Sequence, residues 1–217
     1  MSVAKSPIPV SMPQPVLKRL PRYLNYLKVK RAHEEGLARI SSTVIAADLG
    51  LNPVQVRKDL AFINNSGKPR TGFDLEALID DIEQYLGYSQ AKNAALVGVG
   101  HLGQALLAYV GFAEYGLNIL AAFDVDPTVV GKMVRGKRVY HTDDLRAHIK
   151  GGDVQIGIIT APAAYAQDVC NQLIECGVGA IWNFAPVHLE APEQVIVQNE
   201  DIAASLAFLS NELQRRG

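Results

Sequence analysis

The chain has 217 residues, of which 48% are hydrophobic and 20% are charged, a composition typical of a globular protein. Its length fits one large domain or two small ones. The sequence has no uncharged apolar run of roughly 18 residues, which a membrane-spanning helix would need. Residues 1–14 lack the apolar stretch of a signal peptide. We therefore expect a cytoplasmic protein with no membrane partner.

The net charge of −1 conceals an asymmetry along the chain. Residues 1–73 hold 12 Lys/Arg against 4 Asp/Glu, whereas residues 74–217 hold 9 Lys/Arg against 18 Asp/Glu. A basic part joined to an acidic part indicates that the first part faces a polyanion. DNA, RNA and an acidic lipid surface all satisfy that condition.

The cysteines and histidines do not form a recognisable metal or redox pattern. Cys170 and Cys176 lie in one expected helix but point in different directions, which favours two small core residues over a thiol switch. The five histidines lack metal-ligand spacing. We expect no metal.

The chain is expected to begin with a flexible arm and a helix. Residues 1–15 carry four prolines and form the predicted arm. Leucines then recur at helical spacing from Leu17 to Leu27. Pro21 either opens this helix at its first turn or kinks it.

Two short helices after the first have the spacing of a helix-turn-helix. Residues 41–43 cap the first of them, and Gly50 ends it. Asn52 caps the second, with Pro53 at its first position. The second helix exposes Arg and Gln, which read guanine and adenine in the major groove. The turn-rich residues 64–72 after it are typical of a wing. The expected DNA contacts are Gln55, Arg57, Lys58, Lys68 and Arg70.

A change of pattern divides the chain near Ser89. Residues 75–86 predict an amphipathic helix, ended by Gly87. Beyond residue 93, short apolar strands alternate with helices, which predicts a parallel α/β sheet. The expected strands are 94–97, 117–123, 154–160, 180–184 and 194–197. The expected helices run from the glycine-rich turn to Glu114, from Thr142 to Ile149, and from Ala163 to Glu175.

A glycine-rich motif, residues 98–103, follows the first of these strands and opens a helix. In this context Gly98 makes the turn, Gly100 lets the backbone approach a pyrophosphate, and Gly103 lets helix pack on strand. Asp124 ends the next strand, where a carboxylate accepts a hydrogen bond from a ribose 2′-OH and favours NAD(H) over NADP(H). The expected cofactor-binding residues are Gly98, Val99, Gly100, His101, Leu102, Gly103, Tyr109, Asp124 and Thr160.

The sequence lacks the catalytic pairs of a dehydrogenase. Neither a His–Asp pair nor Tyr-x-x-x-Lys occurs in the second half, and His188 is isolated. We expect no catalytic residues, and we expect the dinucleotide to be sensed rather than consumed. Two other interpretations stay open: an NAD-dependent oxidoreductase with a basic N-terminal module, and a constitutive DNA-binding protein whose Rossmann domain only dimerises.

With these motifs the chain resembles the bacterial Rex family of redox-sensing transcriptional repressors, from Leu17 to the C-terminus. The motifs that carry the resemblance are residues 55–60 (QVRKDL), 96–106, 123–127 (FDVDP) with Gly131, and 183–186 (NFAP). The resemblance implies a homodimer that binds double-stranded operator DNA. NADH and NAD⁺ would be its regulatory ligands, with NADH releasing the DNA.

The resemblance also implies the domain organisation. Within an α/β fold class, it gives a flexible arm (1–15), a winged helix-turn-helix (16–88), a Rossmann-type doubly wound parallel sheet (89–198) and a domain-swapped C-terminal helix (199–217). Tyr109 and Asp201 match the pair that links the nicotinamide pocket to the partner. Asn25 and Ile202 replace an Arg and a Phe that are usual in relatives, and the wing moves its arginine by one. The expected coupling and dimer residues are Asn25, Asp201, Ile202, Leu206 and Leu209.

Overall fold

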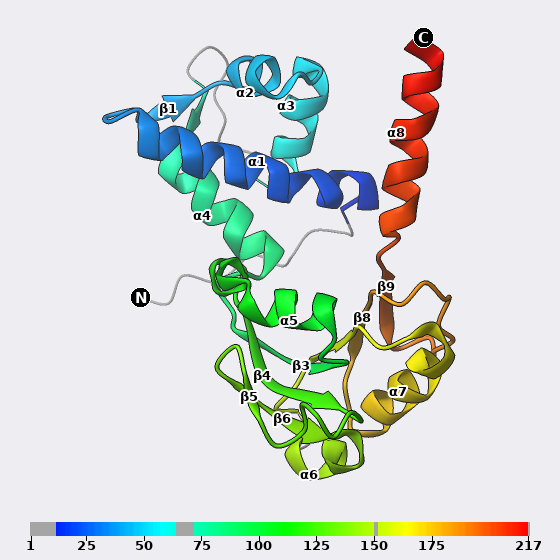
Figure 1. Ribbon diagram of the computed structural model, residues 1–217. Helices are drawn as coiled ribbons and strands as arrows, with labels where there is room; N and C mark the ends of the chain where they lie inside the picture. Colours follow the sequence, from blue (N-terminus) through cyan, green and yellow to red (C-terminus); the bar gives the residue numbers. More distant parts are fainter. Residues whose placement is uncertain (1–11, 64–71, 150–151, 217) are drawn as a thin grey trace, which may run out of the picture. The chain divides into compact units, whose positions relative to one another are not determined.

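The computed structural model describes residues 12–63, 72–149 and 152–216. The chain divides into two compact units, residues 1–89 and 90–217 (Figure 1). The first unit contains α1 (Gln14–His33), β1 (Arg39–Ile40), α2 (Ser42–Leu49), α3 (Pro53–Ala61), β2 (Phe73–Asp74) and α4 (Leu75–Leu86).

The long helix α1 contributes one side of the first unit's hydrophobic core. It buries one stripe completely, including Leu20, Tyr23 and Leu27, against residues of α3 and α4. The helix starts at Gln14, so the last two residues of the expected flexible arm are helical. Pro21 does not open the helix but lies inside it, because Pro15 occupies the first turn, where a missing N–H costs nothing.

The helix-turn-helix is formed by the capping residues that the sequence predicts. The Ser41 hydroxyl accepts from the Val44 N–H at 3.2 Å, and Gly50 ends α2 with φ at +64°. Asn52 Oδ1 accepts from the Val54 N–H at 2.8 Å at the start of α3. These predicted caps are confirmed, and they define where α2 begins and ends and where α3 begins.

A buried ion pair attaches α3 to α1. The Arg19 guanidinium donates to both carboxylate oxygens of Asp59, at 2.7 and 2.9 Å, and the Tyr23 hydroxyl donates to Asp59 at 2.7 Å. The Asp59 side chain is only 4% exposed. Burial, and then the hydrogen bond to Asp59, raise the pKa of Tyr23 to about 12. The sequence motif contains Asp59, but its anchoring role was not predicted.

The second unit is built on a seven-stranded sheet in the order β5-β6-β4-β3-β7-β8-β9. Its strands are β3 (Lys92–Val97), β4 (Leu117–Asp124), β5 (Met133–Val134), β6 (Lys137–His141), β7 (Ile156–Ile159), β8 (Ala180–Asn183) and β9 (Ile196–Asn199). All neighbours are parallel except β5, which is antiparallel to β6. From β6 to β9 this is the strand order of a doubly wound dinucleotide-binding sheet, as predicted.

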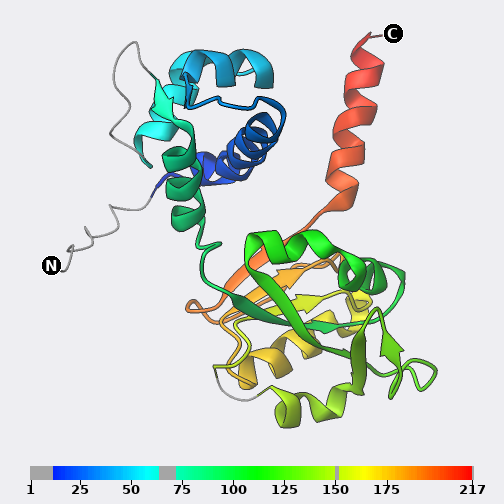
Figure 2. The ribbon, with the colours of Figure 1, turned by 90° about the vertical axis from the view of Figure 1, so that its left-hand side faces the viewer.

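Helices cover both faces of this sheet (Figure 2). α5 (His101–Ala108) and the 3₁₀ helix η1 (Val110–Tyr115) pack on one face, and α6 (Leu145–His148) and α7 (Ala163–Glu175) pack on the other. Alternate residues of β3 point to the two faces, with Leu96 in one core and Val97 in the other. Cys170 and Cys176 are buried free thiols in the α7-side core, so their prediction as core residues is confirmed.

The structure corrects three predicted elements. The helix expected to run to Glu114 stops at Ala108, because Tyr109 is extended (φ −77°, ψ 102°) and its ring folds over Gly111. The short strands β5 and β6 were not predicted, since they lack a long apolar run. The helix expected from Thr142 to Ile149 is a 3₁₀ turn, η2 (Thr142–Asp144), followed by α6, and His141 caps it.

The chain ends in α8 (Ile202–Arg216). The Asp201 carboxylate accepts from the Ala204 N–H at 2.9 Å and caps the first turn of this helix. Leu206, Leu209 and Leu213 are each more than half exposed, at 65%, 57% and 72%. An exposed apolar stripe of this kind is typical of a surface that binds another protein chain.

The Asp59 network predicts a defined pH response of the first unit's stability. Tyr23→Phe removes one hydrogen bond to a buried charge, and we expect a loss of about 1–3 kcal/mol in unfolding free energy at pH 7. Because the folded-state pKa of Tyr23 is raised to about 12, its contribution is complete below pH ~10 and is lost as pH rises toward 12. Urea unfolding at pH 7 and at pH 11 measures both effects.

The matched control is Tyr165→Phe, because Tyr165 is 63% exposed. It should leave the unfolding free energy unchanged within error at both pH values. A Tyr23→Phe protein whose deficit stays the same size from pH 7 to pH 11 would contradict the assignment.

Candidate functional site

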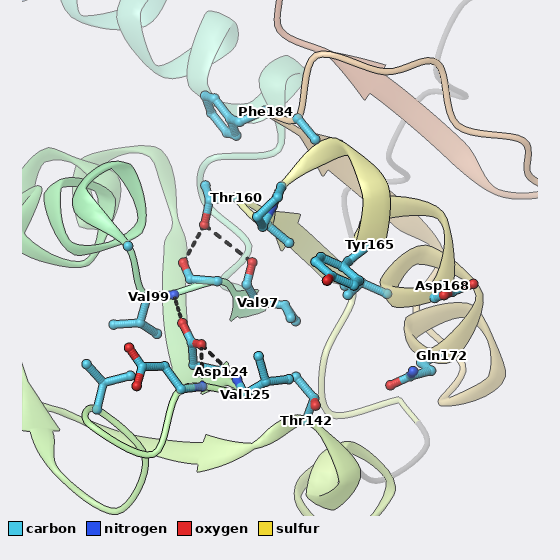
Figure 3. A pocket seen from close by; sticks show the side chains of 18 of the residues that line it. Val97, Val99, Asp124, Val125, Thr142, Thr160, Tyr165, Asp168, Gln172 and Phe184 are labelled. Atoms are coloured by element: carbon cyan, nitrogen blue, oxygen red, sulfur yellow. Dashed lines mark hydrogen bonds between the residues drawn. The ribbon is translucent and has the colours of Figure 1, made fainter.

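A cleft of about 810 Å³ opens at the carboxyl ends of the central strands (Figure 3). Its walls come from the segments that follow β3, β4, β7 and β8 and from one side of α7. β3 and β7 are neighbours in the sheet whose crossovers run in opposite directions, so the strand order reverses between them. Open α/β sheets bind their ligands at this position.

The three glycines of the motif take three different roles. Gly98 has φ at +102°, and a Cβ there would lie 2.7 Å from the Ala161 nitrogen, so the turn passes directly against the segment after β7. A Cβ on Gly103 would collide with the Gly98 carbonyl oxygen, so α5 packs closely on the turn. A Cβ on Gly100 would meet nothing within 4 Å. Gly100 lines the cleft, so its missing side chain leaves the backbone open to a ligand.

Asp124 is held rigidly at the end of β4. One carboxylate oxygen accepts from the Val99 N–H, and the other accepts from the N–H groups of Val125 at 2.7 Å and Asp126 at 2.9 Å (Figure 3). These bonds fix the carboxylate beside the glycine turn. Lone pairs remain on its oxygens to accept from a hydroxyl in the cleft.

Thr160 connects the segment after β7 to the glycine-rich turn after β3. Its hydroxyl donates to the Gly98 carbonyl at 2.6 Å, across from β7 to the glycine turn (Figure 3). Thr160 also lines the cleft. The bond holds the first turn of the motif in position beside the cleft.

The charged side chains in the lining are carboxylates. Asp124, Asp126 and Asp168 line the cleft, and no Lys, Arg or His occurs among its described lining residues. The backbone N–H of Thr128, together with its hydroxyl, lowers the pKa of Asp126. Asp126 is therefore ionised at neutral pH and adds a fixed negative charge next to Asp124.

The residues that line the cleft follow one another in the same order as the strands that precede them in the sheet. Asp124 ends β4, Gly98 follows β3, Thr160 follows β7 and Phe184 follows β8, in the order of the strands across the sheet. Figure 3 shows Phe184 and Asp124 on opposite sides of Thr160. The Phe184 end is apolar, with Ala185 and Pro186 beside it. The cleft is therefore polar and acidic at one end and apolar at the other.

The structure brings together part of the predicted cofactor set. Gly98, Val99, Gly100, Asp124 and Thr160 line the cleft, whereas His101, Leu102, Gly103 and Tyr109 do not. His101 and Leu102 begin α5, and Gly103 acts by packing. Tyr109 is 53% exposed and packs edge-on against Phe112, with ring centroids 4.9 Å apart.

Sequence reasoning missed much of the lining. Residues after each parallel strand could have been named from the rule that ligands bind at the carboxyl ends, which would have found Thr142, Ala161 and Phe184. The side chains that α7 contributes, Tyr165 and Asp168, gave no comparable signal, because a helix face toward a cleft looks like any solvated face.

The basic face of the first unit is carried by α3. Arg57 and Lys58 are exposed, as a recognition helix requires. Gln55 is half-buried, and its amide oxygen can be oriented to accept from the Arg19 Nε at 3.1 Å. The same Arg19 holds Asp59, so one guanidinium braces two positions of α3. The predicted wing contacts Lys68 and Arg70 lie outside the described residues.

The predicted coupling and dimer residues lie in two elements. Asn25 is exposed on α1, Asp201 caps α8, and Ile202 is the first residue of α8. Leu206 and Leu209 are exposed on the same helix.

Over 12–63, 72–149 and 152–216, no helix has the length and apolar character to cross a membrane. The side chains of this part of the chain form no group of three or more His, Cys, Asp or Glu suited to a metal ion.

Two family models match the chain, one in each unit. Residues 11–61 match the model described as "Putative DNA-binding protein N-terminus". Residues 89–187 match the model described as "CoA binding domain".

Solved structures of RSP, a Rex-family repressor, match the whole chain. RSP in complex with β-NAD⁺ and operator DNA has a TM-score of 0.88 and 31% identity, over 96% of this chain and 95% of that one. RSP in complex with β-NADH has a TM-score of 0.84 and 32% identity, over 96% and 97%. The predicted fold class is thereby confirmed, while the swap of the last helix stays a prediction.

Curated relatives have a higher sequence identity to this chain and match over more than nine tenths of their own lengths. The redox-sensing transcriptional repressor Rex of Bacteroides thetaiotaomicron is 41% identical over 202 residues, 93% of this chain and 91% of that protein. The Rex repressor of Treponema denticola is 42% identical over 207 residues, 95% and 96% of the two chains. On this similarity, and on the fold and cleft that accompany it, the chain belongs to the Rex family of redox-sensing transcriptional repressors.

Proposed function

We propose that this protein is a transcriptional repressor that binds double-stranded operator DNA and releases it when NADH occupies the cleft. The observation that carries the proposal is the full-length likeness to RSP, whose structures hold operator DNA with NAD⁺ in one case and NADH in another. The protein's own residues supply both halves of that activity.

The DNA-binding half rests on α3. Arg57 and Lys58 are exposed on a helix fixed by the Asp59 network, so they can enter a major groove in a defined orientation. Lys68 and Arg70 in the wing, together with Gln55, complete the proposed DNA contacts. Contacts to phosphates from this basic unit would make binding strongly salt-dependent.

The ligand-binding half rests on the row of residues across the sheet. The open backbone at Gly100 suits the pyrophosphate, and Asp124 suits a ribose hydroxyl. The apolar end at Phe184 suits the uncharged dihydronicotinamide, whereas the cationic ring of NAD⁺ has a desolvation cost there. NADH and NAD⁺ are therefore the proposed regulatory ligands, with NADH preferred in the closed cleft.

The acidic end of the cleft argues against coenzyme A, although the matching family model carries that name. Coenzyme A and NADPH both carry an extra phosphate on the adenosine ribose. In this chain that phosphate would face Asp124 and the ionised Asp126, with no cation among the described lining residues. Repulsion between like charges therefore weakens the binding of both ligands relative to NADH.

We further propose that the protein is not an enzyme. Its relatives are repressors, and neither Lys nor His is among the described residues that line the cleft, where a dehydrogenase would need a proton-transfer group. An NAD-dependent oxidoreductase is the alternative, and steady-state turnover of NADH with small carbonyl compounds would favour it. A protein that acts on operator DNA works where the DNA is, so the cytoplasm stays the proposed location.

The proposed assembly is a homodimer in which α8 packs on a partner subunit. The exposed leucines of α8, Leu206, Leu209 and Leu213, would be buried there. Asp201 and Ile202 would then reach the partner's region of Tyr109, and Asn25 would lie in the same contact network. A dimer can hold two α3 helices at the spacing of two operator half-sites, roughly 34–36 Å.

The first prediction of this proposal concerns linkage. If NADH favours a dimer geometry that misplaces the α3 helices, saturating operator must weaken NADH binding by the same factor as NADH weakens operator binding. We expect a factor of about 5–150. Titration of NADH with and without operator DNA measures it, with NAD⁺ as the control ligand. Equal NADH affinity in both titrations would refute the sensor function.

The second prediction concerns ligand choice. The protein should bind NADH more tightly than NADPH or coenzyme A, by at least about tenfold, which corresponds to ~1.4 kcal/mol of charge repulsion. Asp124→Asn should narrow the gap to NADPH, because it removes the negative charge, and the loss of one of the two acceptor oxygens weakens the binding of both nucleotides. Calorimetry measures all three ligands. Asp168→Asn is the control variant, because it neutralises another carboxylate of the lining, and it should leave the preference for NADH over NADPH unchanged. Equal affinity of the unmodified protein for NADH and NADPH would contradict the role of Asp124.

The third prediction concerns DNA. Arg57→Ala should weaken specific operator binding by about 1–3 kcal/mol, the value of one bidentate base contact. Arg31→Ala is the matched control, because Arg31 is also an exposed arginine of the first unit but pairs with Glu76 at 2.8 Å. Fluorescence anisotropy at fixed salt measures both variants. If the two variants lose the same affinity, Arg57 contributes only general positive charge.

A further inference from the structure

The loop that forms the apolar end of the cleft and the segment that leads into α8 are connected through one buried side chain. Asn183 ends β8 and is completely buried. Its amide nitrogen donates to Asn199 Oδ1 and to the Val187 carbonyl, both at 2.9 Å, and its amide oxygen accepts from the Ala185 N–H at 2.9 Å. One side chain thus holds the cleft loop and the end of β9 together.

Backbone hydrogen bonds also connect the end of β8 to the segment before α8. Asn183 pairs with Asn199 in the parallel ladder of β8 and β9, and the Glu200 N–H donates to the Asn183 carbonyl at 2.8 Å. Glu200 is followed by Asp201, whose carboxylate caps the first turn of α8 at Ala204. A shift of the cleft loop therefore reaches the cap of α8 through a short run of hydrogen bonds.

Trp182 adds a second connection on the opposite side of the strand. Its indole N–H donates to the Glu200 carboxylate at 2.9 Å. Its ring lies between two others, with centroids 4.9 Å from Phe184 and 5.8 Å from Phe112. Phe184 lines the cleft, whereas neither Trp182 nor Glu200 does. Trp182 therefore contacts a cleft residue with its ring and the segment before α8 with its N–H.

We propose that Trp182 and Glu200 are positioning residues, and that their hydrogen bond transmits occupancy of the cleft to the start of α8. A ligand ring against Phe184 moves or stiffens the aromatic row, and the indole N–H carries that change to Glu200 and the adjoining cap. This inference rests on the proposed function, because it requires NADH in the cleft. It adds residues that neither bind the ligand nor contact the DNA.

The bond is suited to transmission rather than to stability. Trp182 and Glu200 are both only half-buried, so their loss leaves no orphaned group deep in a core. Asn183 is the opposite case, since its removal would strand several buried polar groups. Variants of Trp182 and Glu200 can therefore change coupling without unfolding the sheet.

The test compares three variants with the unmodified full-length protein. Glu200→Ala and Trp182→Phe each break the bond, and the Phe ring keeps the aromatic contact. Glu200→Gln keeps an oxygen that accepts from the indole. Exposed Glu193, in the segment before β9, supplies the matched control Glu193→Ala. For each protein, NADH affinity is measured with and without operator DNA, and their ratio is the coupling factor.

We expect Glu200→Ala and Trp182→Phe to bind NADH alone within about twofold of the unmodified protein, while their coupling factor falls by roughly two- to thirtyfold. Glu200→Gln and Glu193→Ala should retain the full factor. A purely structural role would lower affinity and thermal stability but leave the ratio intact. An unchanged ratio in both bond-breaking variants would overturn the proposal.

Amide hydrogen exchange over residues 199–204 tests the same inference without DNA. NADH should change protection there in the unmodified protein and in Glu200→Gln, but not in Glu200→Ala. If NADH leaves this segment unchanged in the unmodified protein, the inference fails even when operator and NADH are coupled. If operator and NADH prove uncoupled while the exchange pattern appears as expected, the proposed function fails and the transmission stands.

Discussion

The second unit depends on the contact between Gly98 and Gly103. A side chain at Gly103 would collide with the Gly98 carbonyl, so α5 can lie against the turn only because that side chain is missing. The contact places the start of α5 where the strand order of the sheet reverses, and the Thr160 hydroxyl locks the turn from the other side. The cleft, its open backbone at Gly100 and the position of Asp124 all follow from this packing.

The first unit solves a different problem, which is to present a short helix rigidly. α3 spans only Pro53–Ala61, too short to be stable by itself. Caps at Asn52 and the buried Asp59 pair with Arg19 fix both its start and its inner face. Breaking such a pair by removing one partner costs about 3–5 kcal/mol, because the other charge is left buried. The outward residues Arg57 and Lys58 are therefore displayed from a fixed support.

Local chemistry explains which features the sequence could predict. The predicted caps at Ser41 and Asn52 and the predicted extent of α7 depend on neighbouring residues, and they match the structure. Features that depend on residues far apart were missed. The burial of Asp59, for example, needs Arg19 and Tyr23 from another helix. The part of the cleft formed by α7 is likewise set by the sheet's twist and packing.

The pairing of β1 with β2 has a consequence for how the first unit opens. Ile40 faces Phe73 in this short ladder, and Gly72 passes so close that a Cβ there would lie 2.5 Å from the Ile40 carbonyl. The pairing of β1 with β2 thus closes a loop of the chain that contains both helices of the helix-turn-helix. Closing that loop lowers the entropy of the chain, and the contacts inside the loop form at a lower entropic cost once β1 and β2 are paired. The helix-turn-helix should therefore exchange its amide hydrogens as one cooperative unit, opening together or not at all.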